Sequence, residues 1–302
     1  MFKLLSRESN IFSIPVYMVF LLFIVVTFNG LNFNSVNIAS TVITFAGTAL
    51  GYFLFNKINL NYQTHTPLFL YTFMVFALYP GSLDIGIAVS VFTNSFILLL
   101  LTSTNDKLRK SSYILIGAIL AVNFIFLPTT WPLGIFVLIH IIATSGRIGL
   151  NIFRLVFGML LVFLSYFSMM FYLNYTSWDL SYFPFGKFSP ETSFYPLYFL
   201  VPVALLMIYG VMEHFRHFNE KSPTSKFKYT FILVFSLAQL VTIILYMGTE
   251  YGYLLLLAFP ASVILSRALA YMPKYWEREF FLWIIIISLL LFKTGNYIEF
   301  FN

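Results

Sequence analysis

Apolar stretches separated by short polar gaps follow one another along the whole chain. Because an α-helix rises about 1.5 Å per residue and the hydrocarbon core of a bilayer is about 30 Å thick, about 20 apolar residues make one crossing. The pattern therefore predicts an all-α, polytopic membrane bundle of 10 to 11 transmembrane helices. The expected crossings lie near residues 11–28, 38–55, 67–79, 85–101, 113–127, 132–145, 152–173, 195–212, 229–247, 253–265 and 280–292.

Four of these stretches are shorter than a standard crossing, namely 67–79, 113–127, 132–145 and 253–265. A short stretch can lie where the bilayer thins, or it can fail to cross fully. The fifth and sixth stretches could instead form a re-entrant hairpin around residues 127–132, Leu-Pro-Thr-Thr-Trp-Pro. Both ends of such a hairpin would still face the same side, so the orientation of the remaining helices would not change.

Lysine and arginine residues fall almost entirely into every second gap between the apolar stretches. With the N-terminus inside, fifteen of the seventeen lie in inside segments, and only Lys187 and Lys293 lie outside. Cytoplasmic loops of membrane proteins carry an excess of Lys and Arg. The distribution predicts a multi-pass protein of the bacterial inner membrane, with a cytoplasmic N-terminus and an extracytoplasmic C-terminus.

Composition agrees with this assignment. The 302 residues are 60% hydrophobic and 9% charged, whereas soluble domains carry roughly 25% charged residues. We therefore expect one integral membrane domain over residues 1–302, without a soluble domain. The absence of cysteine excludes disulfides and thiolate chemistry. The net charge of +6 is explained by cytoplasmic Lys and Arg rather than by nucleic-acid binding, and no cofactor is expected.

Charged and polar side chains within membrane spans usually mark function, but here the centres of the expected spans hold no charge. Arg154, Arg267 and Lys293 lie near span ends, where long side chains can reach the headgroups. His140 is the only histidine inside a span and is expected to bond between helices rather than to hold haem. The polar residues within spans each need a partner; they are Asn94, Asn123, Gln239, Ser165, Ser168 and Ser266.

Carboxylates on the expected outer face are the only candidates for extracytoplasmic general bases or cation ligands. They include Asp84, Asp179 and Glu250, together with Glu191. Asp84 follows Tyr-Pro-Gly-Ser-Leu at the mouth of the fourth span. A solvated loop acid is the alternative interpretation of each.

Three groups of residues could form contacts with a partner or with lipid. A GxxxG pattern in the second span permits close helix packing, within this chain or between chains. A long outer loop is aromatic and could lie in the membrane interface or hold a partner. A long inner loop is basic. The candidate residues are Gly47 and Gly51 in the first group, Trp178, Tyr182 and Phe185 in the second, and Arg216, Lys226 and Lys228 in the third.

Three segments together resemble an uncharacterised family of multi-pass inner-membrane proteins of Gram-negative Bacteroidota. They are residues 61–101, which include Tyr79-Pro-Gly-Ser-Leu83, residues 113–128, and residues 258–281 with Trp276-Glu-Arg-Glu-Phe-Phe281. The resemblance implies a location and no reaction. A weaker resemblance, carried by the outer Pro80 and Asp84 and the long fourth span, is to GT-C glycosyltransferases, which use polyprenyl-phosphate sugars. Only Asp84 matches their outer-loop acid, because the first outer loop, 29–37, has none.

Three functions follow from these features. The first is a non-catalytic subunit or scaffold of a cell-envelope membrane complex, with a membrane-protein partner and lipid as its contacts. The second is a GT-C-like enzyme in which Asp84 is the base or metal ligand and Glu250 or Asp179 assists. The third is a transporter of lipid or a small molecule without ion coupling. Whether any chemistry occurs is left open by the sequence.

Overall fold

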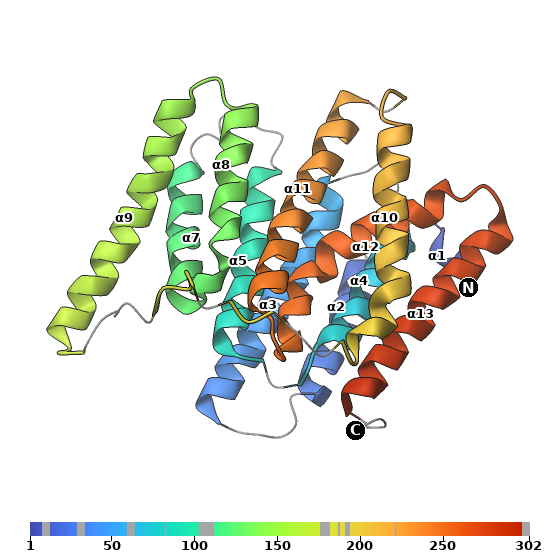
Figure 1. Ribbon diagram of the computed structural model, residues 1–302, viewed down its shortest axis with the longest axis horizontal. Helices are drawn as coiled ribbons and strands as arrows, with labels where there is room; N and C mark the ends of the chain where they lie inside the picture. Colours follow the sequence, from blue (N-terminus) through green and yellow to red (C-terminus); the bar gives the residue numbers. More distant parts are fainter. Residues whose placement is uncertain are drawn as a thin grey trace.

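The protein is described by a computed structural model covering residues 1–7, 13–28, 34–58, 64–81, 83–102, 112–175, 182–186, 188–190, 194–220 and 222–297. Regular structure in these residues consists of helices (Figure 1). They are α1 (Phe2–Leu5), α2 (Ser13–Phe28), α3 (Ser35–Ile58), α4 (His65–Leu78), α5 (Ile85–Leu101), α7 (Tyr113–Phe126), η1 (Pro128–Thr130), α8 (Pro132–Thr144), α9 (Ile148–Tyr172), η3 (Leu197–Leu200), α10 (Val201–Arg216), α11 (Pro223–Tyr246), η4 (Tyr251–Leu257), α12 (Ala258–Tyr271) and α13 (Tyr275–Tyr297).

Each expected apolar stretch coincides with a helix, so the all-α prediction is confirmed. Five helical segments are long and apolar enough to cross a membrane: Ser35–Phe55, Ile148–Tyr172, Leu197–Arg216, Pro223–Tyr246 and Tyr251–Tyr271. Shorter apolar helices form at the other stretches, including α4 with 14 residues, α7 with 14 and α8 with 13. The number of crossings therefore remains a prediction.

The tenth stretch was placed too narrowly at 253–265. In the structure η4 leads directly into α12, and together they form a segment of 21 residues, Tyr251–Tyr271. The boundary was wrong because charged and aromatic residues usually mark the ends of a membrane span, and Arg267 and Tyr251 were interpreted in this way. Both residues instead belong to the helical segment.

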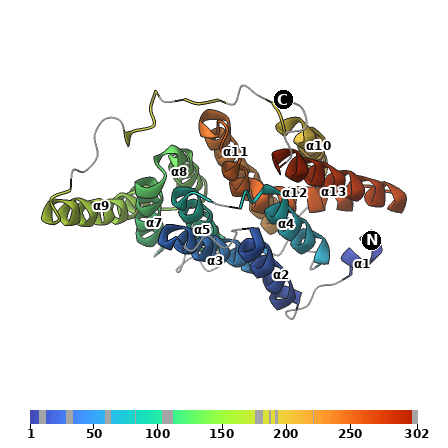
Figure 2. The same cartoon turned by 90° about the horizontal axis from the view of Figure 1, so that it is seen from below.

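Successive long helices run in alternating directions (Figure 1). The turns that join α8 to α9 and α10 to α11 lie together at the upper edge of that view, and we call this end of the bundle the basic end. The opposite end holds the loops before α5 and η4. Figure 2 shows an elongated arrangement with α9 at one extreme and α13 at the other. The tightest helix pairs are α7 with α9, α3 with α5, and α10 and α4 with α12.

The GxxxG pattern of α3 is used within the chain. A Cβ on Gly47 would lie 2.7 Å from the Cα of Phe92 on α5, and one on Gly51 would overlap the Tyr71 side chain of α4. Ser95 of α5 donates a hydrogen bond of 2.8 Å to the Gly47 carbonyl. Because the chain's own helices cover both glycines, neither is available as a contact for a second chain.

Many polar side chains inside the bundle bond either to a neighbouring helix or to a carbonyl of their own helix, as a lipid environment requires. Ser90 of α5 donates to the Asn123 amide oxygen of α7 at 2.7 Å, and the hydroxyls of Tyr52 and Thr72 lie 2.5 Å apart. Among the described residues, the expectation that every such group finds a partner was wrong for the Asn94 amide and for Oε1 of Gln239, neither of which makes a hydrogen bond.

Candidate functional site

Asp84 caps the helix that follows it. It is the N-cap residue of α5, and its Oδ2 accepts a hydrogen bond of 2.8 Å from the backbone N–H of Gly86. A carboxylate in this position satisfies one of the free N–H groups of the first helical turn and interacts favourably with the helix dipole. The structure thus supplies a local structural role for the residue that the sequence singled out as a base.

Glu250 shares a neighbour with Asp84, the Tyr253 side chain, at the end of the bundle opposite the basic end. It is the N-cap residue of η4, and both carboxylates are within electrostatic reach of the Tyr253 hydroxyl. That hydroxyl lies 3.1 Å from the hydroxyl of Thr129. Both acids are exposed, and the third candidate, Asp179, lies outside the described residues.

The donor set for a metal ion is poor in the part of the chain that the structure describes. No group of three or more His, Cys, Asp or Glu side chains comes together there. Hard cations such as Mg²⁺ and Ca²⁺ are held mainly by carboxylate and carbonyl oxygens. Asp84 and Glu250 are both exposed N-cap residues. Solvated helix caps have this arrangement, so it does not by itself indicate a catalytic pair.

The aromatic outer loop folds back on its own chain at two points. The Tyr182 hydroxyl donates to the carbonyl oxygens of Phe124 and Ile125 at the end of α7. Phe185 lies 5.8 Å, centre to centre, from the Trp131 ring, although Phe185 itself is largely exposed. Trp178 lies outside the described residues. Tyr182 is therefore a structural contact, and Phe185 remains a candidate for contact with a partner or lipid.

The basic inner loop forms a charged cluster at the basic end. Arg216 makes a 3.0 Å ion pair with Glu213, which is buried. The His217 Nδ1 lies 3.1 Å from the second oxygen of the same carboxylate, and the His217 ring stacks on Tyr271. His217, paired with Glu213, thus joins the end of α10 to the end of α12.

Two lysines of this loop differ in their surroundings. The Lys226 ammonium lies 4.9 Å from the centre of the Phe218 ring, a distance typical of a cation–π contact. Lys228 is buried. Of the three basic candidates, Arg216 and Lys226 are therefore the two that an external anion could approach.

Two cations that were expected to reach the headgroups are buried instead. Arg267 is 8% exposed and Lys293 is 5% exposed. Arg267 donates to the Ser225 hydroxyl at 3.3 Å, and Lys293 donates to the Tyr79 carbonyl at the end of α4. The expectation was wrong because a neighbouring helix covers each side chain before it can extend to the interface. Arg154, by contrast, is half-buried and donates to Asn151.

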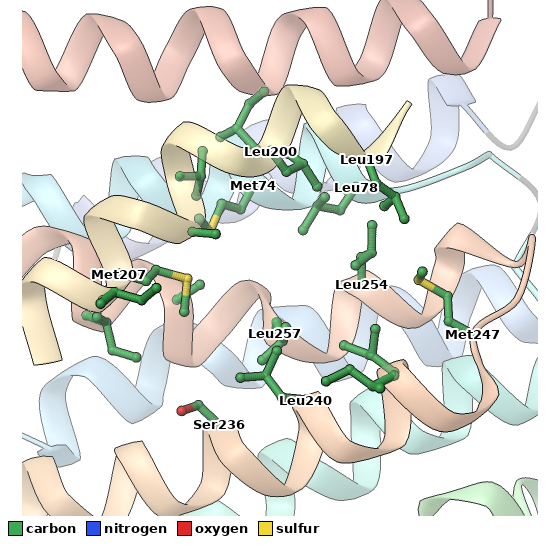
Figure 3. A pocket seen from close by; sticks show the side chains of 18 of the residues that line it. Met74, Leu78, Leu197, Leu200, Met207, Ser236, Leu240, Met247, Leu254 and Leu257 are labelled. Carbon is green, nitrogen blue, oxygen red and sulfur yellow. The ribbon is translucent and has the colours of Figure 1, made fainter. Parts of the chain in front are cut away.

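A deep apolar groove lies between α10 and α11, with α12, η4 and α4 beneath it. Its volume is about 740 Å³. Figure 3 shows Leu200 of η3, Met207 of α10 and Leu240 of α11 directed into one space, with Leu254 and Leu257 of η4 between them. Ser236 is the single polar side chain among the residues that line it.

The groove opens sideways. Ile208 and Met212 on α10 and Ile244 on α11 line it and are each more than half exposed. Toward the basic end, beyond Met212 of the lining, the rings of His214 on α10 and Tyr229 on α11 lie 4.3 Å apart, centre to centre. Sequence reasoning missed the groove. The available signal was a row of small or flexible apolar residues on α10, which is not distinguishable from an ordinary packed face; they are Val203, Ala204, Met207 and Val211.

Comparisons with known proteins identify a family for this chain but no activity. No curated protein and no solved structure matches the sequence. Residues 1–301 match the family described as "Family of unknown function (DUF6427)". Because the match covers nearly the whole chain, this protein belongs to the DUF6427 family of unknown function.

Proposed function

We propose that this protein is a multi-pass protein of the bacterial inner membrane that acts as a non-catalytic subunit or scaffold of a cell-envelope complex. Its N-terminus faces the cytoplasm. The alternating helix directions (Figure 1) and the excess of Lys and Arg at the basic end support this orientation, since cytoplasmic segments retain positive charge. The partner docks as a transmembrane helix on α9.

The observation that carries this proposal is the exposure of the second half of α9, whose first half packs closely on α7. Only 17% of its apolar 18-residue window is buried, against 83% of the corresponding window of the η4–α12 segment. Its contact with the bundle is made in the half near the basic end, where Gly158 and Leu155 pack against α7. Beyond Phe163, which meets Phe124, the helix extends at the edge of the bundle (Figures 1 and 2).

The exposed part of α9, residues 164–172, has features of a helix–helix interface. Leu164 and Met169 are each 62% exposed and Phe171 is 85% exposed. Ser165 and Ser168 are also exposed. Small and hydroxyl side chains are enriched where transmembrane helices meet, because they allow close approach and bond across the interface. Ser165 already donates to the Leu161 carbonyl one turn earlier on α9, so it is the small size of the two serines, which permits close approach of a second helix, that favours a protein partner.

Photo-crosslinking tests the proposal in the native membrane. A photoreactive phenylalanine analogue is placed at Ser168, and for comparison at Val19 of α2, which is 68% exposed. We expect one discrete protein adduct from position 168, which mass spectrometry identifies, and only lipid adducts from position 19. Diffuse lipid adducts from both positions would contradict the proposal.

Co-purification supplies the second measurement. The double substitution Ser165→Trp and Ser168→Trp adds bulk to the proposed interface without entering the packed bundle. We expect the crosslinked protein to be lost from gentle detergent extracts of this variant and retained with Val19→Trp. Equal recovery from both variants would exclude residues 164–172 as the docking site.

A further inference from the structure

We propose that the groove between α10 and α11 binds one acyl chain of an anionic phospholipid, whose phosphate lies at the basic end. This inference is independent of the partner that docks on α9. It assigns a ligand class to the deepest apolar recess described above and an orientation to that ligand.

The lining and the shape select a hydrocarbon chain. Apart from Ser236, the walls are aliphatic, aromatic or methionine side chains, so a polar ligand would lose its hydration without gaining partners. From Leu200 to Met212 the groove follows α10 for about 18 Å at 1.5 Å per residue. One leaflet of the hydrocarbon core is about 15 Å thick, so the groove accommodates one chain lying along its leaflet.

The lateral opening selects a membrane lipid over a soluble ligand. Ile208 and Ile244, on the two rims, are 56% and 63% exposed, and they face the surface that the bilayer covers. A lipid can therefore enter sideways from its own leaflet. Methionine side chains, here Met74, Met207 and Met247, are flexible and fit irregular apolar chains well.

Charge orients the lipid. At the basic end the groove approaches four cations, Arg216, Lys226 and Lys228 from the α10–α11 region and Arg267 from α12, one turn beyond Ile264 of the lining. The described carboxylates there are Glu213, Glu220 and Glu277. Glu277 lies 3.9 Å from the Lys274 ammonium and within electrostatic reach of Tyr209 on α10. The four cations and Lys274 outnumber these three acids, so positive charge prevails. At the other end Glu250 follows Met247 of the lining by three residues. Basic pockets at cytoplasmic helix ends attract anionic headgroups.

Native mass spectrometry of the purified full chain tests this. Phosphatidylglycerol and phosphatidylethanolamine with identical acyl chains are added to delipidated protein. We expect one phosphatidylglycerol to be retained in preference to phosphatidylethanolamine. Neutralising Arg216 and Lys226 together by glutamine lowers this preference about fivefold per cation, whereas Arg147→Gln, which removes an exposed cation from the α8–α9 turn, leaves it unchanged. Equal retention of both lipids by the wild type would overturn the headgroup assignment.

The groove itself is tested with a matched pair of substitutions. Ala204 lines it, and the adjacent Leu205 does not. We expect Ala204→Trp to abolish retention of phosphatidylglycerol and Leu205→Trp to preserve it. Retention by Ala204→Trp would overturn the proposal.

A measurement on the wild type keeps the inference testable if Ala204→Trp fails to fold. Phosphatidylglycerol carrying a photoreactive diazirine in its acyl chain is reconstituted with the protein and irradiated. We expect labelling concentrated at Met207, Leu240 and Ile244. Labelling spread evenly over lipid-facing positions such as Val19 and Leu160 would show annular contact only and would overturn the assignment.

Discussion

The guanidinium carbon of Arg267 lies 4.6 Å from the centre of the Tyr229 ring, which joins the end of α12 to the start of α11. The same guanidinium donates to Ser225, one turn earlier on α11. Among the residues that the structure describes, its Nη1 has no hydrogen-bond partner and no carboxylate pairs with it. A buried cation is therefore held by an aromatic face and one hydroxyl.

Arg267→Met tests how this cation contributes to stability. Burying a charge with incomplete partners is unfavourable, and apolar residues of similar volume often replace such groups without loss. We expect Arg267→Met to melt at the wild-type temperature or above it in detergent. Arg267→Ala should melt lower, because it leaves a cavity beside Tyr229, which costs about 2–5 kcal/mol for a large buried side chain. A melting temperature of Arg267→Met as low as that of Arg267→Ala would show that the charge itself is required.

Asp84 provides a test that separates a cap from a catalytic base. Replacing an N-cap aspartate by alanine costs about 1 kcal/mol, whereas asparagine is an equally good cap. We expect Asp84→Ala to lower the thermal unfolding temperature and Asp84→Asn to retain it. If Asp84 were a base of a sugar transferase, Asp84→Asn would fold normally and abolish the cellular function. Complementation of a deletion strain by Asp84→Asn distinguishes the two roles.

The fold was largely predictable because its signal is local. An apolar stretch of about 20 residues has to form its backbone hydrogen bonds internally in lipid, and a helix does this with residues four apart. The η4–α12 segment shows where the argument fails. Arg267 looks like a segment end in sequence, and only the packing of α11 over it shows that the helix continues past the charge.

The candidate sites were less predictable because they depend on which helices are neighbours. Asp84 is recognisable from sequence as a helix cap, because an aspartate just before a helix accepts from an N–H two residues later, here that of Gly86. Only the fold shows that Asp84 and Glu250 share Tyr253 as a neighbour. The groove forms because α10 and α11 are separated from each other above α12. The residue types at Val203, Ala204 and Met207 do not indicate this separation in the sequence. Gly117 and Gly158, which form the closest helix contact, lie in no GxxxG pattern.

The docking of α1 should depend on pH through Glu279. Its carboxylate accepts hydrogen bonds from the Met1 amino group at 2.9 Å and from the Phe2 N–H at 2.7 Å. The bond from the amino terminus, above all, holds the pKa of Glu279 below its usual value of 4.5. Because the pKa of Glu279 is lower in the folded state, its stabilisation of α1 docking is complete above the pKa of the unfolded state. This stabilisation is lost as the pH falls through the pKa of the folded state.

A spin label measures this directly, since the chain has no cysteine. Ser6→Cys places a single label on the exposed Ser6 beside α1. We expect an immobilised spectrum at pH 7 and a mobile one as the pH falls below about 4.5, the ordinary glutamate range. In the Glu279→Gln background the label should be more mobile at pH 7 and change little with pH. A pH response that persists in this background would assign the transition to another group.

The contact between α7 and α9 rests on two glycines, and a third glycine supplies its control. A Cβ on Gly117 would overlap the carbonyl of Leu155, and one on Gly158 would overlap the carbonyl of Ile114. Backbone carbonyls cannot move aside, so the helices have to separate, and overpacking of this kind costs about 1–3 kcal/mol. Gly149, in the first turns of α9, has no atom within 4 Å of its Cβ position. There alanine should stabilise the helix by up to about 1 kcal/mol.

We therefore expect Gly158→Ala to lower the melting temperature and Gly149→Ala to retain or raise it. Because this contact is the main attachment of α9, Gly158→Ala should also increase cleavage by added protease in the turn before α9, at Arg147. Since the docking face at residues 164–172 lies beyond the glycines, the crosslink from Ser168 should persist in this variant as long as α9 still spans the membrane. Equal melting temperatures for the two variants would mean that α9 is held by the side chains around Leu155 and Phe163 and not by the close approach of the backbones.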